Sequence, residues 1–153
     1  MAGELPATRH TEIFHARHCT CNLHVHLAFA VKCRKKILTA EILKDLKIIF
    51  EAICLEPGAD LIEFDGEQDH VHLLIPYPPK LAISDLAFRL KGVSSRLIRQ
   101  RNHPSVTTEL WGHHPWSPSY FAASCGGAPI SIIDNTLKTR IPPIRQGVRM
   151  SLP

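Results

Sequence analysis

Two segments with the apolar periodicity of a helix alternate along this chain with short strand-like segments, and this order constrains the fold most. The first helix is expected to follow Thr39, a favourable N-cap, and to end at Pro57-Gly58. The second is expected to follow Ser84 and to end near Arg101. Both repeat apolar residues about every 3.6 positions. These are Ile42, Leu43, Leu46, Ile49, Phe50 and Ile53 in the first helix, and Leu86, Leu90, Val93 and Leu97 in the second.

The strand-like segments surround these helices. Apolar runs predict strands at residues 24–31, 61–64 and 70–75, with shorter fragments at residues 110–111 and 120–123. Asp65-Gly66 is a turn signal, so the second and third strands are expected to pair antiparallel. Pro129 suits the first position of a last helix. The order predicts an α+β fold, a ferredoxin-like or RRM-like sandwich whose antiparallel sheet has its helices on one face.

The composition is that of one soluble globular domain. The 153 residues are 44% hydrophobic and 21% charged, enough for a substantial core. No apolar run approaches the roughly 20 residues of a membrane helix, and the N-terminus lacks a signal pattern, so we expect no membrane association and a cytoplasmic location. Five scattered cysteines lack zinc-site spacing and are expected to be reduced. Residues 1–20 are expected to form an irregular arm.

The positive charge is gathered in two clusters, although the net charge is only +4. The first cluster occupies residues 32–36 and the second residues 89–101, where five basic residues follow one another with no acid between them. Either cluster alone could be a solvated surface. The two together favour a polyanionic partner, most simply nucleic acid.

A pair of histidines lies in the sequence DHVHLL at residues 69–74. Successive side chains of a strand point to opposite faces, so His70 and His72 share one face. Two imidazoles side by side on a sheet are a natural platform for a divalent metal. A second His-Val-His at His24 and His26 shows that the pattern alone does not decide the site.

Several motifs, taken in their order along the chain, decide which histidine pair is the expected site. The chain contains LHVHL at residues 23–27, KCRKK at 32–36, DHVHLL at 69–74, LKGVSSR at 90–96, and LWG followed by WSPSYF between 110 and 121. In this order they resemble the single-tyrosine HUH transposases of the smallest insertion sequences, the family named after insertion sequence 200. The resemblance extends from about residue 9 to residue 133.

The resemblance implies a homodimeric enzyme that cuts and rejoins single-stranded DNA at hairpin-marked element ends. His70 and His72 correspond to the family's metal pair, where Mg²⁺ or Mn²⁺ would polarise the scissile phosphate. A tyrosine of the last helix would form a 5′-phosphotyrosine, and a glutamine one turn later would complete the metal site. His26 corresponds to a usual family histidine and His24 to a variable position, and both are expected to be structural or surface residues. The residues expected to contact DNA are Arg34, Lys35, Lys36, Arg89, Lys91, Ser95 and Arg96.

The chain departs from the family after Gly126-Gly127-Ala128-Pro129. The family helix reads roughly IEQYIENQ, whereas residues 134–140 here read DNTLKTR. Thr136 occupies the position of the nucleophilic tyrosine, and Arg140 the position of the glutamine ligand. A threonine hydroxyl is a poor substitute for a phenol, and an arginine would repel a metal ion. The C-terminal helix is therefore expected to be altered and catalysis lost.

A one-base deletion at codon 134 would explain the departure. Residues 135–140 can be encoded as AAT ACA TTG AAA ACC AGA, and the same bases read from the third position encode YIENQ. Pro142-Pro143 also forbids a continuing helix. The chain would then divide into the arm at residues 1–20, a transposase-like domain at residues 21–133, and an out-of-frame tail at residues 134–153.

Other interpretations stay open at this point. The chain could be a hairpin-DNA-binding module that no longer cuts, or a fossil reading frame without a stable product. An unrelated metal-dependent hydrolase is a fourth class, and the order of the motifs argues against it.

Overall fold

A computed structural model describes residues 14–110 and 114–125. A small hairpin, β1 (Phe14–Ala16) and β2 (Cys19–Cys21), precedes the main domain. The remaining elements are β3 (His24–Ala30), a 3₁₀ turn (Lys32–Arg34), α1 (Ala40–Leu55), β4 (Glu63–Gly66), β5 (His70–Pro76), α2 (Ile83–Gln100), α3 (Pro104–Leu110) and β6 (Phe121–Ser124).

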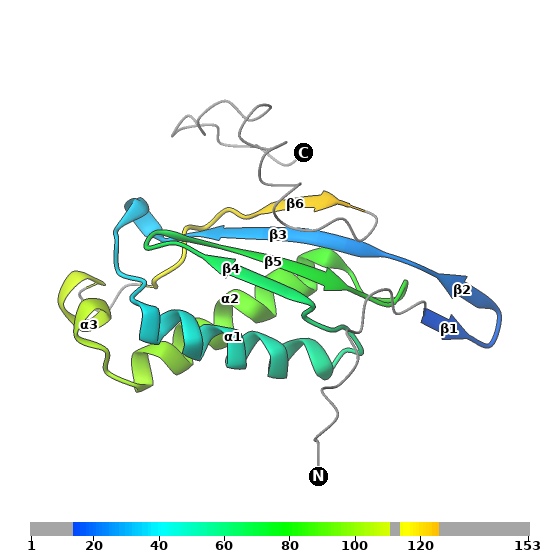
Figure 1. Ribbon diagram of the computed structural model, residues 1–153, viewed down its shortest axis with the longest axis horizontal. Helices are drawn as coiled ribbons and strands as arrows, with labels where there is room; N and C mark the ends of the chain where they lie inside the picture. The colour runs from blue at the N-terminus through cyan, green and yellow to red at the C-terminus, as the bar shows by residue number, and fades with distance from the viewer. Residues whose placement is uncertain (1–13, 111–113, 126–153) are drawn as a thin grey trace, which may run out of the picture.

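The main sheet has four antiparallel strands in the order β4-β5-β3-β6. Helices α1 and α2 cover one face of it, and α3 lies at one end of the molecule (Figure 1). The two strands that are first and third in the domain lie in the centre, with the second and fourth at the edges. This arrangement confirms the ferredoxin-like α+β sandwich with its helices on one face.

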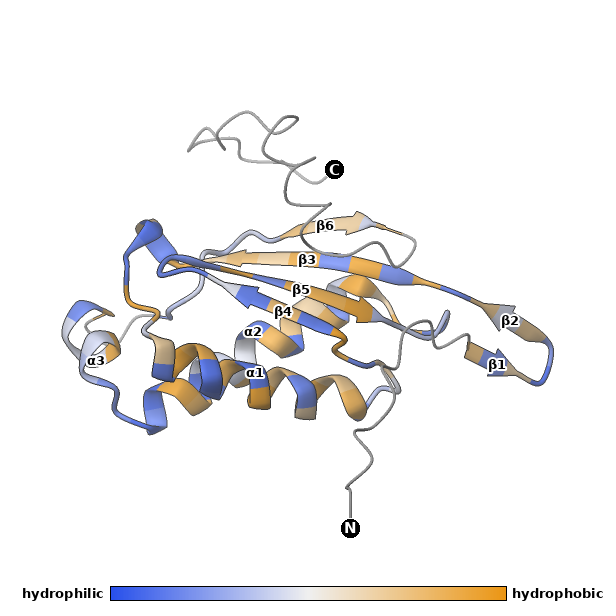
Figure 2. Ribbon diagram, in the orientation of Figure 1, coloured by the Kyte–Doolittle hydropathy of each residue, from blue (hydrophilic) through white to orange (hydrophobic). Residues whose placement is uncertain are grey.

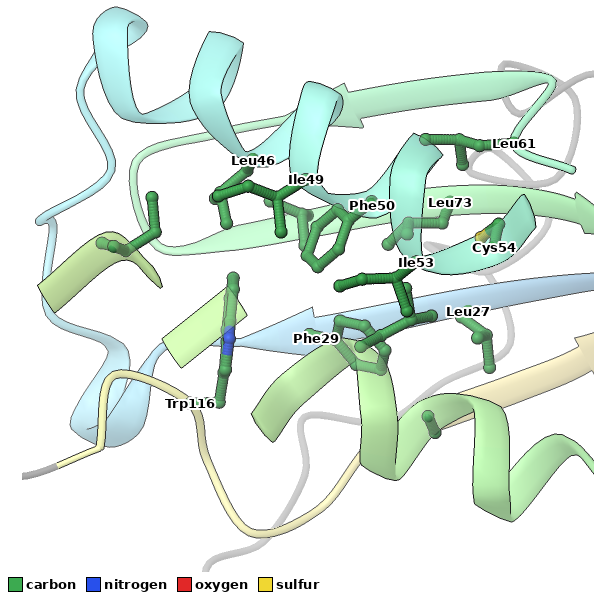
Figure 3. Close-up of a cluster of buried hydrophobic side chains, with 14 of the residues drawn as sticks. Leu27, Phe29, Leu46, Ile49, Phe50, Ile53, Cys54, Leu61, Leu73 and Trp116 are labelled. Atoms are coloured by element: carbon green, nitrogen blue, oxygen red, sulfur yellow. The ribbon is translucent and has the colours of Figure 1, made fainter. Parts of the chain in front are cut away.

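The core lies between the sheet and the two long helices. Apolar and polar residues alternate along α1 and α2 (Figure 2), and the buried apolar residues of both helices belong to one core cluster with those of the strands, as the 3.6-residue period requires. Phe50 lies in this core beside Phe29 and Trp116 (Figure 3). Its ring centroid is 5.9 to 6.4 Å from those of Phe29, Phe64 and Trp116. Trp116 comes from the loop before β6, and its Nε1 donates to Ser94 Oγ on α2 at 2.9 Å. The loop is thereby fastened to the helix layer.

Of the two N-cap residues predicted from the sequence, one is confirmed and the other is wrong. Thr39 caps α1 as predicted, because its Oγ1 accepts from the backbone N of Ile42 at 3.4 Å. The prediction that Ser84 caps α2 is wrong. The carbonyl of Ala82 already accepts from Leu86 N at 3.1 Å, so the helix begins at Ile83.

Two further predictions are corrected by the described residues. The irregular arm is wrong for residues 14–20, because Phe14 pairs with Cys21 across an antiparallel hairpin. The predicted strand fragment at residues 110–111 is wrong at Leu110, because residues 104–110 form α3, and residue 111 falls outside the described residues. Pro104 starts this helix, and Val106 and Leu110, four residues apart, are both buried against the core. The predicted C-terminal helix falls outside the described residues.

Candidate functional site

His70 and His72 of β5 lie on the sheet face opposite to α1 and α2. Val71 and Leu73, which alternate with them, are fully buried in the core beneath the helices. The two imidazole rings are 5.0 Å apart between centroids and meet edge to face at 89°. Their direct neighbours on β3 are the small residues Ala30 and Ala28. These alanines leave the space above the sheet to the imidazoles.

Each of the two imidazoles has a protein partner at Nδ1. Asp69 Oδ1 lies 2.6 Å from His70 Nδ1, and Arg34 Nε lies 3.5 Å from the other oxygen of the same carboxylate. Partial burial alone would raise the pKa of Asp69, but the hydrogen bond from His70 and the nearby Arg34 charge outweigh it and lower the pKa. His26 Nε2 lies 3.0 Å from His72 Nδ1. Both metal-candidate histidines are therefore oriented by residues behind them.

This donor set fits a divalent metal. With Nδ1 held by protein, Nε2 is the ring nitrogen through which each histidine would bind an ion. Mg²⁺ and Mn²⁺ prefer carboxylate oxygens, and the carboxylates of Glu67 and Asp69 lie near His70. Glu67, Asp69 and His70 offer ligand atoms that all lie within 4.8 Å of one another. The basic 3₁₀ turn adjoins this cluster, and its residues Cys33 and Arg34 have left-handed backbones with φ of 59° and 53°.

The second His-Val-His divides into two different environments. His24 and His26 both lie on β3, on the same sheet face as His70 and His72, and are 2% and 0% exposed. The structural alternative of the sequence prediction therefore holds for both, and the surface alternative is wrong. His26 contacts His72, whereas both ring nitrogens of His24 are buried without a hydrogen-bond partner among the described residues. Sequence reasoning missed the contact of His26, because no local pattern reports a cross-strand neighbour.

A family described as "Transposase IS200 like" matches residues 19–138, which is most of the chain.

The chain belongs to this IS200-like transposase family.

Individual transposases are also similar to this chain in sequence or in structure. The ISDra2 transposase TnpA of Deinococcus radiodurans is 38% identical over 98 residues, covering 64% of this chain and 69% of that protein. The transposase for insertion sequence element IS200 of Salmonella typhimurium is 24% identical over 136 residues, covering 89% and 88%. Among solved structures, a candidate transposase from Deinococcus radiodurans R1 has a TM-score of 0.69 and 28% identity, covering 84% of this chain and 98% of that one. A REP-associated tyrosine transposase bound to a REP hairpin shares the fold with a TM-score of 0.53 and 9% identity, covering 74% and 61%.

The residues expected to contact DNA in this IS200-like transposase have different surroundings. Arg34 is ion-paired with Asp69 beside His70, Lys35 with Glu109 of α3, and Arg89 with Glu56. Lys36 and Arg96 are exposed. The structure thus places Arg34 at the histidine pair and spreads the other four over several surfaces.

Lys91 and Ser95 are less exposed than Lys36 and Arg96. Lys91 Nζ donates to the carbonyls of Ser117, Pro118 and Ser119 at 2.6, 3.1 and 3.2 Å. Burial also lowers the pKa of Lys91. Ser95 is 3% exposed. Lys91 thus holds the loop before β6, and DNA contact by Lys91 and Ser95 stays a prediction.

Thr136 and Arg140, the positions that are predicted to decide catalysis, lie outside the described residues. The other site residues are all described. Among the described helices, none has both the length and the apolar character needed to cross a lipid bilayer.

The environment of His24 leads to a stability prediction. Replacing it with Leu removes a buried imidazole without a hydrogen-bond partner, so we expect His24→Leu to raise the free energy of unfolding by about 1–2 kcal/mol at pH 7. Burial lowers the pKa of His24 below its ordinary value of 6.5. Below that pH the unfolded chain binds a proton that the folded chain does not, so the wild type loses stability as pH falls.

Urea unfolding at pH 5.5 and pH 7.5 tests the His24 prediction. The advantage of His24→Leu over the wild type should grow at the lower pH, by no more than about 1.4 kcal/mol for each pH unit. A variant less stable than the wild type at pH 5.5 would show that His24 has a stabilising partner.

Proposed function

We propose that this chain is an IS200-like transposase by descent that still binds a divalent metal and hairpin-forming single-stranded DNA but no longer cuts it. The observation that carries the proposal is the oriented pair His70 and His72 on the sheet face opposite to α1 and α2, each with Nδ1 held by a protein partner. Support for the loss of cutting comes from the sequence, which has Thr136 in place of the nucleophilic tyrosine.

Four residues, His70, His72, Asp69 and Arg34, would form the metal-binding part of the site. His70 and His72 would hold Mg²⁺ or Mn²⁺, which supplies charge to polarise the scissile phosphate. Asp69 fixes the orientation of His70, and Arg34 shares the Asp69 carboxylate while it remains more than half exposed. Arg34 is therefore placed to bind a phosphate beside the metal pair. Arg140 cannot replace the glutamine ligand, because a guanidinium offers no lone pair to a metal.

The DNA half rests on the basic residues that remain accessible. Lys36 and Arg96 are exposed, and each would contribute a phosphate contact. The REP-associated transposase of similar fold is bound to a REP hairpin, and we propose a hairpin of single-stranded DNA as the partner here as well. We propose a homodimer, as the family resemblance implies. The DNA-binding domain would span residues 21–133, followed by the out-of-frame tail at residues 134–153.

A salt series tests DNA binding. The full chain should bind a hairpin oligonucleotide from the ends of its own element more tightly than an unstructured strand of equal length. Its affinity should fall steeply with salt. The double variant Lys36→Ala and Arg96→Ala should lower the steepness of log K against log salt by about 2, one for each phosphate contact. The measurement is fluorescence anisotropy between about 50 and 200 mM salt.

The matched control is Lys47→Ala, which removes an exposed lysine of α1 outside both basic clusters. It should leave the salt dependence unchanged. Equal affinity for hairpin and unstructured strands, or an unchanged slope in the double variant, would contradict the proposed DNA surface. A chain that shows no cooperative unfolding would instead support the fossil reading frame.

A further inference from the structure

We propose that His26 is a positioning residue that fixes the tautomer and the ring orientation of His72. The proposal rests on the proposed metal binding by His70 and His72, and it assigns a role to a residue of a different strand. The contact joins His26 Nε2 to His72 Nδ1 at 3.0 Å, across 46 positions of sequence.

The register of the sheet produces this contact. On β3 and β5, Ala28 lies directly opposite His72, and His26 lies opposite Leu74. His26 is therefore the diagonal neighbour of His72 on the same sheet face, a separation that aromatic side chains can bridge. The two ring centroids are 5.1 Å apart and the ring planes are only 13° from parallel, as an in-plane hydrogen bond between ring nitrogens allows. A small residue opposite His72 is what allows the diagonal ring to reach it.

Hydrogen-bond chemistry gives the contact a direction. A neutral imidazole has one N–H donor and one acceptor nitrogen, and a metal takes the acceptor. If His72 binds the ion through Nε2, its proton must sit on Nδ1 and needs an acceptor. His26 Nε2 is that acceptor, which places the proton of His26 on its own Nδ1. Both rings are then neutral, and neither needs a charge in a largely buried place.

The surroundings of His26 hold it in position. It is 0% exposed, and the ring of Phe121 on β6 meets it nearly edge-on at a centroid distance of 6.0 Å. A buried polar ring of this kind keeps its hydrogen bond, because breaking it leaves a desolvated nitrogen. Asp69 has the same role for His70 at the other end of the pair. His70 is thus oriented by a carboxylate and His72 by a second imidazole.

The neighbouring histidine supplies a natural control. His24 shares the strand, the sheet face and the burial of His26. Its ring nitrogens have no hydrogen-bond partner among the described residues. A general effect of removing a buried histidine from β3 would appear in both positions. An effect on His72 would appear only at His26.

Three variants of the full chain, His26→Leu, His26→Gln and His24→Leu, test the proposal. Mn²⁺ affinity is measured by electron paramagnetic resonance of the free ion. His26→Leu should weaken binding by about 10–100-fold, as is usual when an outer partner of a metal ligand is removed. His26→Gln can still accept from His72 Nδ1 and should stay within about 3-fold of the wild type. His24→Leu should bind Mn²⁺ as the wild type does.

A second readout needs no metal. Nitrogen NMR of the metal-free wild type should show the proton of His72 on Nδ1, and in His26→Leu that preference should be lost. A proton on Nε2 in the wild type overturns the proposal, as does equal Mn²⁺ affinity in wild type and His26→Leu. If the wild type binds no Mn²⁺ while the tautomer is as expected, the metal function fails and the positioning by His26 stands.

Discussion

Restoring one base at codon 134 is expected to give a protein that links covalently to single-stranded hairpin DNA, whereas the present chain forms no such adduct. The restored frame changes the whole chain from residue 134 onward, including Thr136→Tyr and Arg140→Gln. A phenol ionises near pH 10 and carries the phosphate as a good leaving group, which an aliphatic alcohol does not. Because losing a nucleophile commonly costs many orders of magnitude, adduct yield should rise by about a thousandfold or more.

The measurement is a gel shift of the protein that survives denaturant, with Mg²⁺ or Mn²⁺ present. Two matched variants complete it. Thr136→Tyr alone, in the present tail, should form no adduct, because Arg140 and Pro142-Pro143 remain. His70→Ala in the restored chain should abolish the adduct by removing a metal ligand. Full cleavage by the single Thr136→Tyr variant would disprove the frameshift explanation.

Replacing Phe50 with Ala is expected to have the second largest effect, a loss of about 3–5 kcal/mol of unfolding free energy. Phe50 is 0% exposed, and its ring lies among three other aromatic rings between α1 and the sheet. Truncation removes the buried ring and leaves a cavity whose walls come from four segments that cannot all close on it. The midpoint of thermal unfolding should fall by roughly 10 °C.

Phe88→Ala is the matched control. Phe88 lies on α2 and is 80% exposed, so the same truncation removes little buried surface and should change stability by no more than about 0.5 kcal/mol. Both variants are compared by urea unfolding of the full chain. Equal losses in the two variants would show that the exposed ring of Phe88 is buried against another surface in solution, and a small loss in Phe50→Ala would contradict the central place of that ring.

Local sequence patterns were sufficient to predict most of the fold. The periods of residues 42–53 and 86–97 reported which sides of α1 and α2 are buried, because a helix repeats its face within a few residues. Helix ends and short elements were less accessible to sequence reasoning. In α3, at residues 104–110, Val106 and Leu110 are buried in the core. In the hairpin of residues 14–21, Phe14 pairs with Cys21. Such choices depend on partners elsewhere in the chain.

The charged residues show the same limit. Lys91 and Arg89 look alike in the sequence, as members of one basic cluster on α2. In the structure Lys91 binds three carbonyls of the loop before β6, and Arg89 pairs with Glu56 at the end of α1. Charge counts therefore indicated an anionic partner, but they could not say which cations remain available for it.

The sequence by itself determined the order of strands and helices, the transposase family, and the positions of His70 and His72, because these depend on neighbouring residues and motif spacing. It also predicts that Thr136 stands where the family has its tyrosine. Only the tertiary structure decided which residues contact and orient the histidine pair. The pairing of β3 with β5 brings His26 to His72 and leaves His24 without such a contact, because the register of two strands is set by the packing of the whole sheet on its helices.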